Sequence, residues 1–263
     1  MEPPIAVLDR QPGAALPPRH PAIRALMAKA HAHPAVRHPY LRALERGALP
    51  DPRGALADFA QTYRHYSAWF PRYLVATMDA LRDPRHRALI AENLVEEGGA
   101  YDDAELAELA SLGVDSDWVV GVPHPRLFDR FCEALGVGAP DEASGAAVAF
   151  REGLLGFLEG ATAAQAVGAI GLGTESVVAT IYQPFVGALK RLPLHPRDTV
   201  FFTLHTAVDD HHARSLLDIS AELASAPDGL GELEEGMQVA LTLRLDLWDQ
   251  LFARARAMDR AAT

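Results

Sequence analysis

The chain is poor in cysteine and in basic side chains. Its 263 residues include one cysteine, Cys132, which excludes an intramolecular disulfide, a cysteine-rich zinc site and a cysteine-ligated iron–sulfur cluster. Lys and Arg number 24 against 35 Asp and Glu, a formal net charge of −11. Such a chain lacks the basic surface with which proteins displace counterions from nucleic acids. A single thiol fits a reducing compartment, so we expect a cytoplasmic protein that binds no nucleic acid.

Several sequence patterns are missing as well. No stretch alternates apolar and polar residues as a half-buried strand does, and no GxGxxG, P-loop, GxSxG or HExxH pattern occurs. The Glu-x-x-His pair of ferritin-like bundles is also absent. The N-terminus lacks the basic start and apolar run of a secretory signal, and its proline-rich residues 1–20 predict an extended arm.

What the chain does have is a helical period almost throughout. Apolar residues recur every three or four positions over 54–81, where Pro71 predicts a kink, and a helix over 84–97 is expected to end at Gly98–Gly99. Longer helices are expected over 161–191 and 196–223. We therefore expect an all-α protein, with one domain of seven to nine helices over 21–263.

The longest charge-poor stretch, 161–189, is long enough to cross a membrane. Its glutamines, glycines and single proline are better explained by a buried core helix than by a membrane span. Gly168, Gly171 and Gly173 would let another backbone approach closely, or let the helix loosen around a site.

Glu175 is the only charged side chain in this stretch. A lone carboxylate on an apolar helix is costly to bury unless it is paired or bound to a metal. A role as a helix cap or a salt bridge to an arginine is the alternative. Glu175 is thus a candidate metal ligand.

The strongest local signal is the segment FFTLHTAVDDHHARSLLDI. His205, Asp209 and His212 stand at i, i+4 and i+7, and at ~100° per residue they share one face of a helix. Two imidazoles and one carboxylate form the set that suits non-haem iron. The alternative is a surface helix whose polar side chains face water, but the flanking Phe201, Phe202 and leucines favour a core helix.

Two further candidates flank residues 100–123. Glu96 and Glu97 end a helix, where the helix dipole disfavours negative charge, so a basic neighbour or a cation must compensate them. His124 opens the next amphipathic helix, over 124–136, and is either a surface group or a ligand.

These segments together resemble the haem-oxygenase-like di-iron oxidases and oxygenases, whose fold is shared with thiaminase-like and pyrroloquinoline-quinone-synthase-like proteins. The matching residues are Asn93-Leu94…Glu97…Gly99, His124…Leu127…Phe131…Leu135-Gly136, the lone Glu175, His205-x3-Asp209-x2-His212, and the aromatic stretch YSAWFPRY from Tyr66 to Tyr73. The resemblance spans about 55–220 and implies a haem-oxygenase-like helical bundle. The chain departs from the family in the spacing of 27 positions from Glu97 to His124, since residues 100–123 look inserted.

The resemblance also implies a metal centre and a reaction. It implies two Fe(II)/Fe(III) ions held by Glu97, His124, Glu175, His205, Asp209 and His212, with Glu96 as a substitute for Glu97. With O2 as co-substrate, such an enzyme would desaturate, cleave, decarboxylate or hydroxylate a small carboxylate-bearing metabolite such as an amino acid or fatty acid. The alternatives are an N-oxygenase of the same family, a metal-free thiaminase-like or quinone-synthase-like enzyme, and a non-catalytic binding protein.

The aromatic stretch offers a pocket for that metabolite. We expect the substrate to lie against residues of the early core helix, namely Tyr63, Tyr66, Trp69, Phe70 and Tyr73. Arg72 is a candidate to hold its carboxylate, as are Arg64 and Arg151. The expected partner is a small molecule, no membrane association is expected, and homodimer formation is left open.

Overall fold

The computed structural model describes residues 20–138, 144–207 and 210–258; of Ala207 and 210–212 it describes the backbone only. Within these residues every regular element is helical, which confirms the all-α prediction. The α-helices are α1 (Pro21–Ala32), α2 (Pro39–Arg46), α3 (Pro52–Ser67), α4 (Phe70–Ala80), α5 (Pro84–Glu97), α6 (Asp103–Ser111), α7 (His124–Ala134), α8 (Gly145–Gly160), α9 (Ala163–Val167), α10 (Ser176–Leu189), α11 (Val200–Ala207), α12 (Asp210–Leu223) and α13 (Gly229–Ala257). A π-helix, η2 (Gly168–Glu175), and two 3₁₀ turns, η1 (Ser116–Trp118) and η3 (Pro196–Thr199), complete the set.

The described residues form more helices than the seven to nine predicted, and two of the predicted helices are divided within the described residues. The helix expected over 54–81 is broken between α3 and α4. Pro71 lies in the first turn of α4, where a backbone N–H has no acceptor within the helix, so proline costs no hydrogen bond there. The helix expected over 161–191 consists of α9, η2 and α10. The one over 196–223 begins with η3 and α11, and α12 follows after residues 208–209, which lie outside the described residues. The predicted arm lies outside the described residues except for His20.

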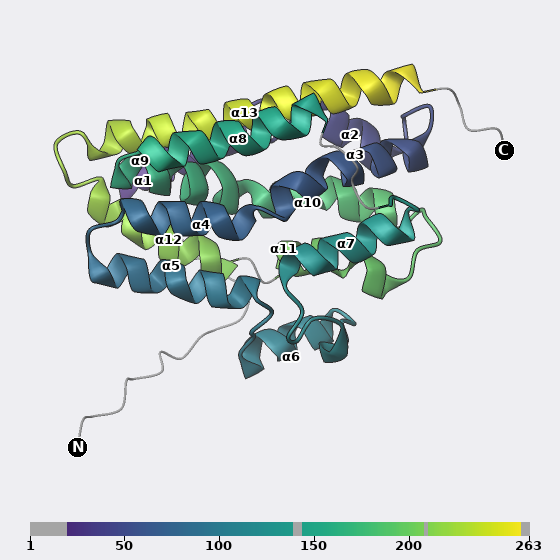
Figure 1. Ribbon diagram of the computed structural model, residues 1–263, viewed down its shortest axis with the longest axis horizontal. Coiled ribbons are helices and arrows are strands. Elements are labelled where there is room, and N and C mark those ends of the chain that lie inside the picture. Colours follow the sequence, from purple (N-terminus) through teal and green to yellow (C-terminus); the bar gives the residue numbers. More distant parts are fainter. Residues whose placement is uncertain (1–19, 139–143, 208–209, 259–263) are drawn as a thin grey trace.

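An aromatic cluster holds one half of the bundle together. Between ring centroids, Phe59 on α3 lies 4.3 Å from Phe185 on α10, and Phe185 stacks at 5.5 Å on Phe202 of α11. Phe131 on α7 and Trp248 on α13 join the same fully buried cluster. Figure 1 shows α13 running along the whole length of the molecule beside α8. The cluster therefore fixes α7 and α11, which carry two of the candidate ligands.

The run from Ala163 to Leu189 is the helix that by length and composition could cross a membrane, but most of it is buried inside the bundle. It packs against α13 through backbone contacts that only glycine allows. A Cβ on Gly168 would lie 2.2 Å from the carbonyl oxygen of Leu233, and one on Gly236 would lie 1.9 Å from that of Gln165. The predicted core helix, its loosening and its close approach to another backbone are confirmed.

This close crossing predicts a large difference between two glycines of α13. Gly236→Ala is expected to lower the free energy of unfolding by about 1–3 kcal/mol or more, because the new methyl group meets backbone that cannot move aside. Gly231→Ala, where nothing lies within 4 Å, is expected to gain about 0.5–1 kcal/mol from helix propensity. Urea denaturation of both variants checks this, and equal effects would contradict the packing.

Candidate metal centre

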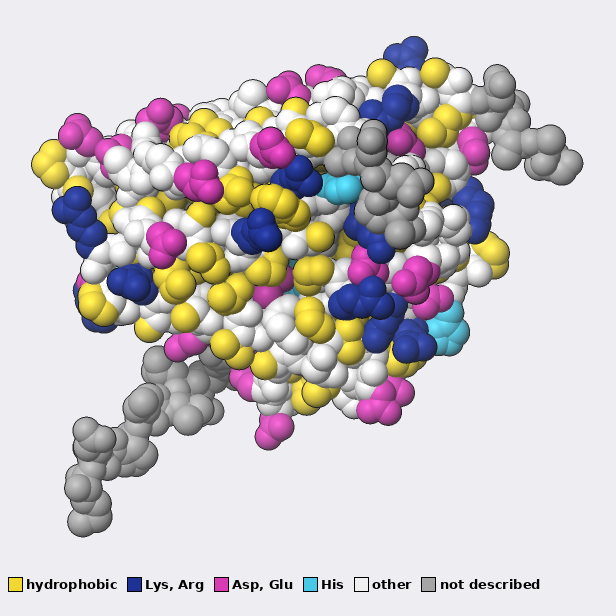
Figure 2. Space-filling view, viewed as in Figure 1, with side chains coloured by type: hydrophobic (Ala, Val, Ile, Leu, Met, Phe, Trp, Pro, Cys, Tyr) yellow, Lys and Arg dark blue, Asp and Glu magenta, His cyan; other side chains and the backbone are white. Residues whose placement is uncertain are grey.

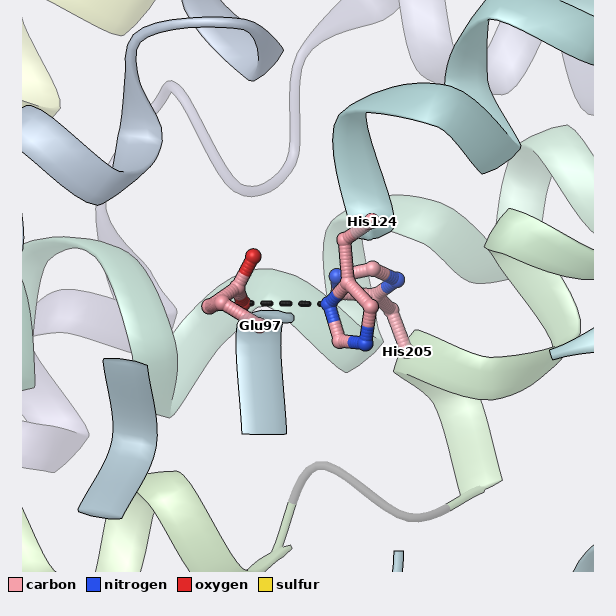
Figure 3. Close-up of side chains that lie close together, drawn as sticks. All are labelled: Glu97, His124 and His205. Atoms are coloured by element: carbon pink, nitrogen blue, oxygen red, sulfur yellow. Dashed lines mark ion pairs between the residues drawn. The ribbon is translucent and has the colours of Figure 1, made fainter. Parts of the chain in front are cut away.

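Three predicted ligands from distant parts of the sequence meet inside the bundle. Glu97 is the last residue of α5, His124 the first of α7, and His205 lies on α11. One ligand atom from each lies within 4.8 Å of the others, and the side chains are 4%, 4% and 8% exposed. Figure 3 shows them pointing toward one another. The structure thus brings together a carboxylate and two imidazoles, a donor set for a transition metal.

Glu97 and His124 stand 27 positions apart in the sequence but lie close together in space. The chain leaves after α5 and returns to the same place, where the Gly121 N–H donates to the Gly99 carbonyl at 2.8 Å. Gly99 has φ +90°, and a Cβ there would lie 2.5 Å from the Val122 nitrogen. Glycine at position 99 therefore lets the ends of this excursion, residues 100–123, meet and places His124 beside Glu97.

Each histidine presents one ring nitrogen to the group and has the other bonded outside it. His205 Nδ1 lies 2.7 Å from the Phe201 carbonyl oxygen, an acceptor, so Nδ1 carries the proton and Nε2 is a possible ligand atom. His124 Nε2 lies 3.0 Å from the Tyr101 hydroxyl. His124 Nδ1 lies 3.1 Å from Glu97 Oε1, yet makes no hydrogen bond because the geometry is wrong for one. A buried imidazole nitrogen beside a carboxylate oxygen without a proton between them fits a shared cation.

Glu175 lies at the same cavity, which has a volume of about 20 Å³. It is 6% exposed and is the last residue of the π-helix, an element frequently found at functional sites. The other residues lining the cavity are Tyr66, Ser67, Phe70, Glu97, His124, Thr174, Val178, Tyr182, Phe201 and His205. At ~10–15 Å³ per water, this volume suits an ion, O2 or one or two waters.

Four of the six predicted ligands therefore line one cavity. Asp209 lies outside the described residues, and so does the side chain of His212. The prediction that Asp209 and His212 share one helical face with His205 therefore stays a prediction. Of the two adjacent glutamates, Glu97 lines the cavity and Glu96 does not.

The predicted substrate residues are divided between the cavity and its surroundings. Tyr66 and Phe70 line it, whereas the Tyr63 hydroxyl lies behind its wall, 2.9 Å from that of Tyr182. Tyr73 donates to the Arg151 carbonyl at 3.4 Å.

Trp69 and Arg72 face away from this cavity. The Trp69 ring lies under the guanidinium groups of Arg72 and Arg151, at 4.3 and 4.5 Å from its centroid. Arg72 borders a wider surface groove of about 710 Å³, which Val75, Leu94 and Leu155 help to line. Figure 2 shows hydrophobic side chains gathered on this face of the molecule.

Arg244 is a charged residue that the sequence reasoning missed. It is 1% exposed, and no carboxylate of the described residues lies within ion-pair distance of it. Its Nη1 donates to the Tyr63 hydroxyl at 2.9 Å and its Nη2 to the Tyr66 hydroxyl at 3.4 Å. The signal was present in the sequence, since the apolar stripe of α13 passes through Leu241, position 244 and Trp248.

Two tyrosine hydroxyls, those of Tyr66 and Tyr182, can donate hydrogen bonds at the cavity wall. Burial raises the pKa of Tyr66 and of Tyr182, so both hydroxyls stay protonated. Because a guanidinium only donates, the Tyr63 and Tyr66 oxygens accept and their own hydrogens can be passed on. Tyr63 can donate to Tyr182, leaving Tyr66 and Tyr182 as donors at the cavity wall.

A second cluster of possible ligands has a simpler explanation. Asp83, His86 and Glu222 lie close together, but the Arg85 guanidinium bonds Asp83 at 2.7 Å and Glu222 at 3.3 Å. Hydrogen bonds from Arg85 lower the pKa of Asp83 to about 2. These ion pairs connect the start of α5 to α12 and need no metal ion.

Comparison with known proteins identifies the family and the fold of the chain. Residues 57–245 match the model of a family described as iron-containing redox enzymes. A CADD-like protein of unknown function from Nostoc punctiforme has a similar solved structure, with TM-score 0.69, 16% identity, and coverage of 89% of this chain and 98% of that one. A TenA homologue from Pseudomonas syringae pathovar tomato gives TM-score 0.67, 13% identity, and coverage of 94% and 100%.

A third structure gives the fold its description. It is a domain of unknown function with a heme oxygenase-like fold from Shewanella denitrificans, with TM-score 0.59, 16% identity, and coverage of 92% of this chain and 95% of that one. No curated protein matches the sequence. The predicted haem-oxygenase-like bundle is confirmed.

Proposed function

Because the chain belongs to the family of iron-containing redox enzymes, we propose that it is a non-haem di-iron oxidase or oxygenase that uses O2. The proposed substrate is a small carboxylate-bearing metabolite, such as an amino acid or a fatty acid. The observation that supports this most is the meeting of Glu97, His124, Glu175 and His205 at one buried cavity.

These four residues would hold the iron ions together with Asp209 and His212. The last two are included because they follow His205 at i+4 and i+7 in the sequence. Three carboxylates and three neutral imidazoles are oxygen and nitrogen donors of the kind that non-haem iron uses. Bound iron supplies the O2 activation and the electrons that protein side chains cannot.

The chain's own residues shape the cavity around that chemistry. Phe70, Val178 and Phe201 form its apolar wall and keep bulk water from the ligands. The cavity is small in this conformation, so a metabolite must displace part of the wall. Phe70 is the most exposed residue of the wall, at 9%, and directly follows the break between α3 and α4. Phe70 is therefore the residue we expect to move.

The substrate carboxylate is proposed to accept hydrogen bonds from Tyr66 and Tyr182. The buried guanidinium of Arg244 lies behind these two donors, and no carboxylate of the described residues is within ion-pair distance of it. The arginines considered from sequence are engaged elsewhere: Arg64 pairs with Asp129 at 2.6 Å, and Arg151 with Glu152 at 2.7 Å. Arg72 lies on the exposed face of Trp69.

Oxidation at carbon is favoured over N-oxygenation. An additional carboxylate on the early core helix would support N-oxygenation, and the two candidates there are Asp58 and Asp79. Asp58 pairs with Arg254 at 2.9 Å, and Asp79 borders the surface groove. Among the described residues, Glu97 and Glu175 are the carboxylates that line the cavity.

The test is O2 consumption by anaerobically iron-loaded protein, mixed with a panel of amino acids and fatty acids. We expect one carboxylate substrate to accelerate O2 uptake strongly and its amide or methyl ester to fail. Uptake that no member of the panel changes would contradict the proposal. Full turnover in the presence of a strong chelator would instead support the metal-free alternative, in which histidine and glutamate act as acid and base.

A further inference from the structure

The excursion of residues 100–123 is more than a spacer between two ligands. It contains α6 and the turn η1, and it buries Leu109 and Val119. Helix α6 lies against α11, which carries His205. In Figure 1, α6 projects below the rest of the bundle, on the side where α5 and α7 lie. The excursion is therefore packed beside the proposed metal centre.

Tyr101, in the first residues of this excursion, bonds directly to a candidate ligand. Its hydroxyl lies 3.0 Å from Nε2 of His124, and the two rings are nearly parallel, at 23° with centroids 6.3 Å apart. Tyr101 is partly buried and does not line the cavity, whereas His124 is almost fully buried and does. Tyr101 thus contacts the ring nitrogen that faces away from Glu97.

The direction of this bond decides which nitrogen of His124 can bind a metal. If Nε2 donates to the Tyr101 oxygen, Nδ1 has a lone pair directed into the group. If the hydroxyl donates instead, Nδ1 carries the proton and should bond Glu97. The Nδ1 and Glu97 Oε1 atoms lie 3.1 Å apart but are not aligned for that bond, which favours the first tautomer.

We propose that Tyr101 is a positioning residue for the metal centre, accepting the Nε2 proton of His124 so that Nδ1 is the metal ligand. This assignment rests on the proposed iron site and gives the excursion a role in it. An outer partner of this kind fixes the tautomer and the ring orientation of a ligating histidine.

The test compares Tyr101→Phe with Tyr40→Phe, each of which removes one hydroxyl oxygen. Tyr40 donates to the Ala55 carbonyl at 3.3 Å on the other side of the fold and is the matched control. Loss of an outer partner typically lowers metal affinity by about 10–100-fold, so we expect that decrease in Co(II) affinity for Tyr101→Phe alone. The metal-free unfolding temperature should be close to the wild-type value, which a purely structural role would not allow.

A second readout does not depend on metal. Nitrogen-15 NMR of the metal-free protein should show His124 with its proton on Nε2, and a mixture of tautomers in Tyr101→Phe. Wild-type protein with the proton on Nδ1, or equal Co(II) affinity in wild type and Tyr101→Phe, would overturn the inference. Wild-type protein that binds no metal would overturn the proposed function, and with it the metal ligation by Nδ1. If its His124 still carries the proton on Nε2, and Tyr101→Phe does not, the hydrogen bond from His124 to Tyr101 stands by itself.

Discussion

Replacing His205 by alanine is expected to lower the affinity for ferrous iron by about 100-fold or more. Loss of an outer partner alone costs about 10–100-fold, and His205 is proposed to bind the metal itself. Its Nδ1 proton is committed to the Phe201 carbonyl, so Nε2 is the nitrogen that the substitution removes from the metal. Anaerobic titration with Fe(II) measures the change.

The matched control is His195→Ala, which removes an exposed imidazole from the turn just before α11. Its iron affinity should equal that of the wild type. Unfolding of metal-free His205→Ala should be measured in parallel, because the cavity left beside Phe201 will itself cost some stability. A folded His205→Ala protein that binds iron as tightly as the wild type would remove this residue from the site.

Replacing Arg244 by methionine is expected to weaken substrate binding without lowering the free energy of unfolding. The guanidinium is buried without a carboxylate partner among the described residues, and methionine fills a similar volume without a charge. Replacement of buried ion pairs by apolar side chains of similar volume is often neutral or stabilising by about 1–4 kcal/mol. Removal of the guanidinium leaves no buried carboxylate unpaired among the described residues, so unfolding should not become easier. Hydrogen bonds to charged groups contribute about 1.5–3 kcal/mol, so loss of the charge behind Tyr66 and Tyr182 should raise KM for the carboxylate substrate about 10–100-fold.

Arg256→Met, on an exposed face of the same helix, is the control and should change the free energy of unfolding by no more than about 0.5 kcal/mol. Arg244→Lys retains the charge but cannot reach two hydroxyls with a rigid fork, so it should give an intermediate KM. An Arg244→Met protein that unfolds several kcal/mol more easily and has an unchanged KM would show that the cation is structural.

The sequence was sufficient for the helices and for most of the candidate ligands. A period of three to four residues predicts helices wherever one face is buried, and a lone Glu175 among apolar residues indicates a site because its burial is costly. Where a helix breaks depends on contacts with other helices. Pro71 predicted a disturbance, but it is compatible with either a kink or the new helix that the structure shows.

The meeting of Glu97 and His124 could not be predicted from their spacing. It depends on the backbone contact between Gly99 and Gly121, which closes the excursion at its base. The contact between Tyr101 and His124 depends on the same closure. No sequence pattern marks a tyrosine that follows a helix end as the partner of a distant histidine. Arg244 was visible as a charge on an apolar stripe, but its partners come from helix α3, almost 180 residues away in the chain.

The iron content of the wild-type chain shows most directly whether Glu97, His124, Glu175 and His205, with Asp209 and His212, hold two iron ions. Metal-free protein should be titrated with Fe(II) under anaerobic conditions, and the bound iron counted per chain after removal of the excess. We predict two iron ions per chain. Less than one iron per chain would contradict a di-iron centre at this cavity.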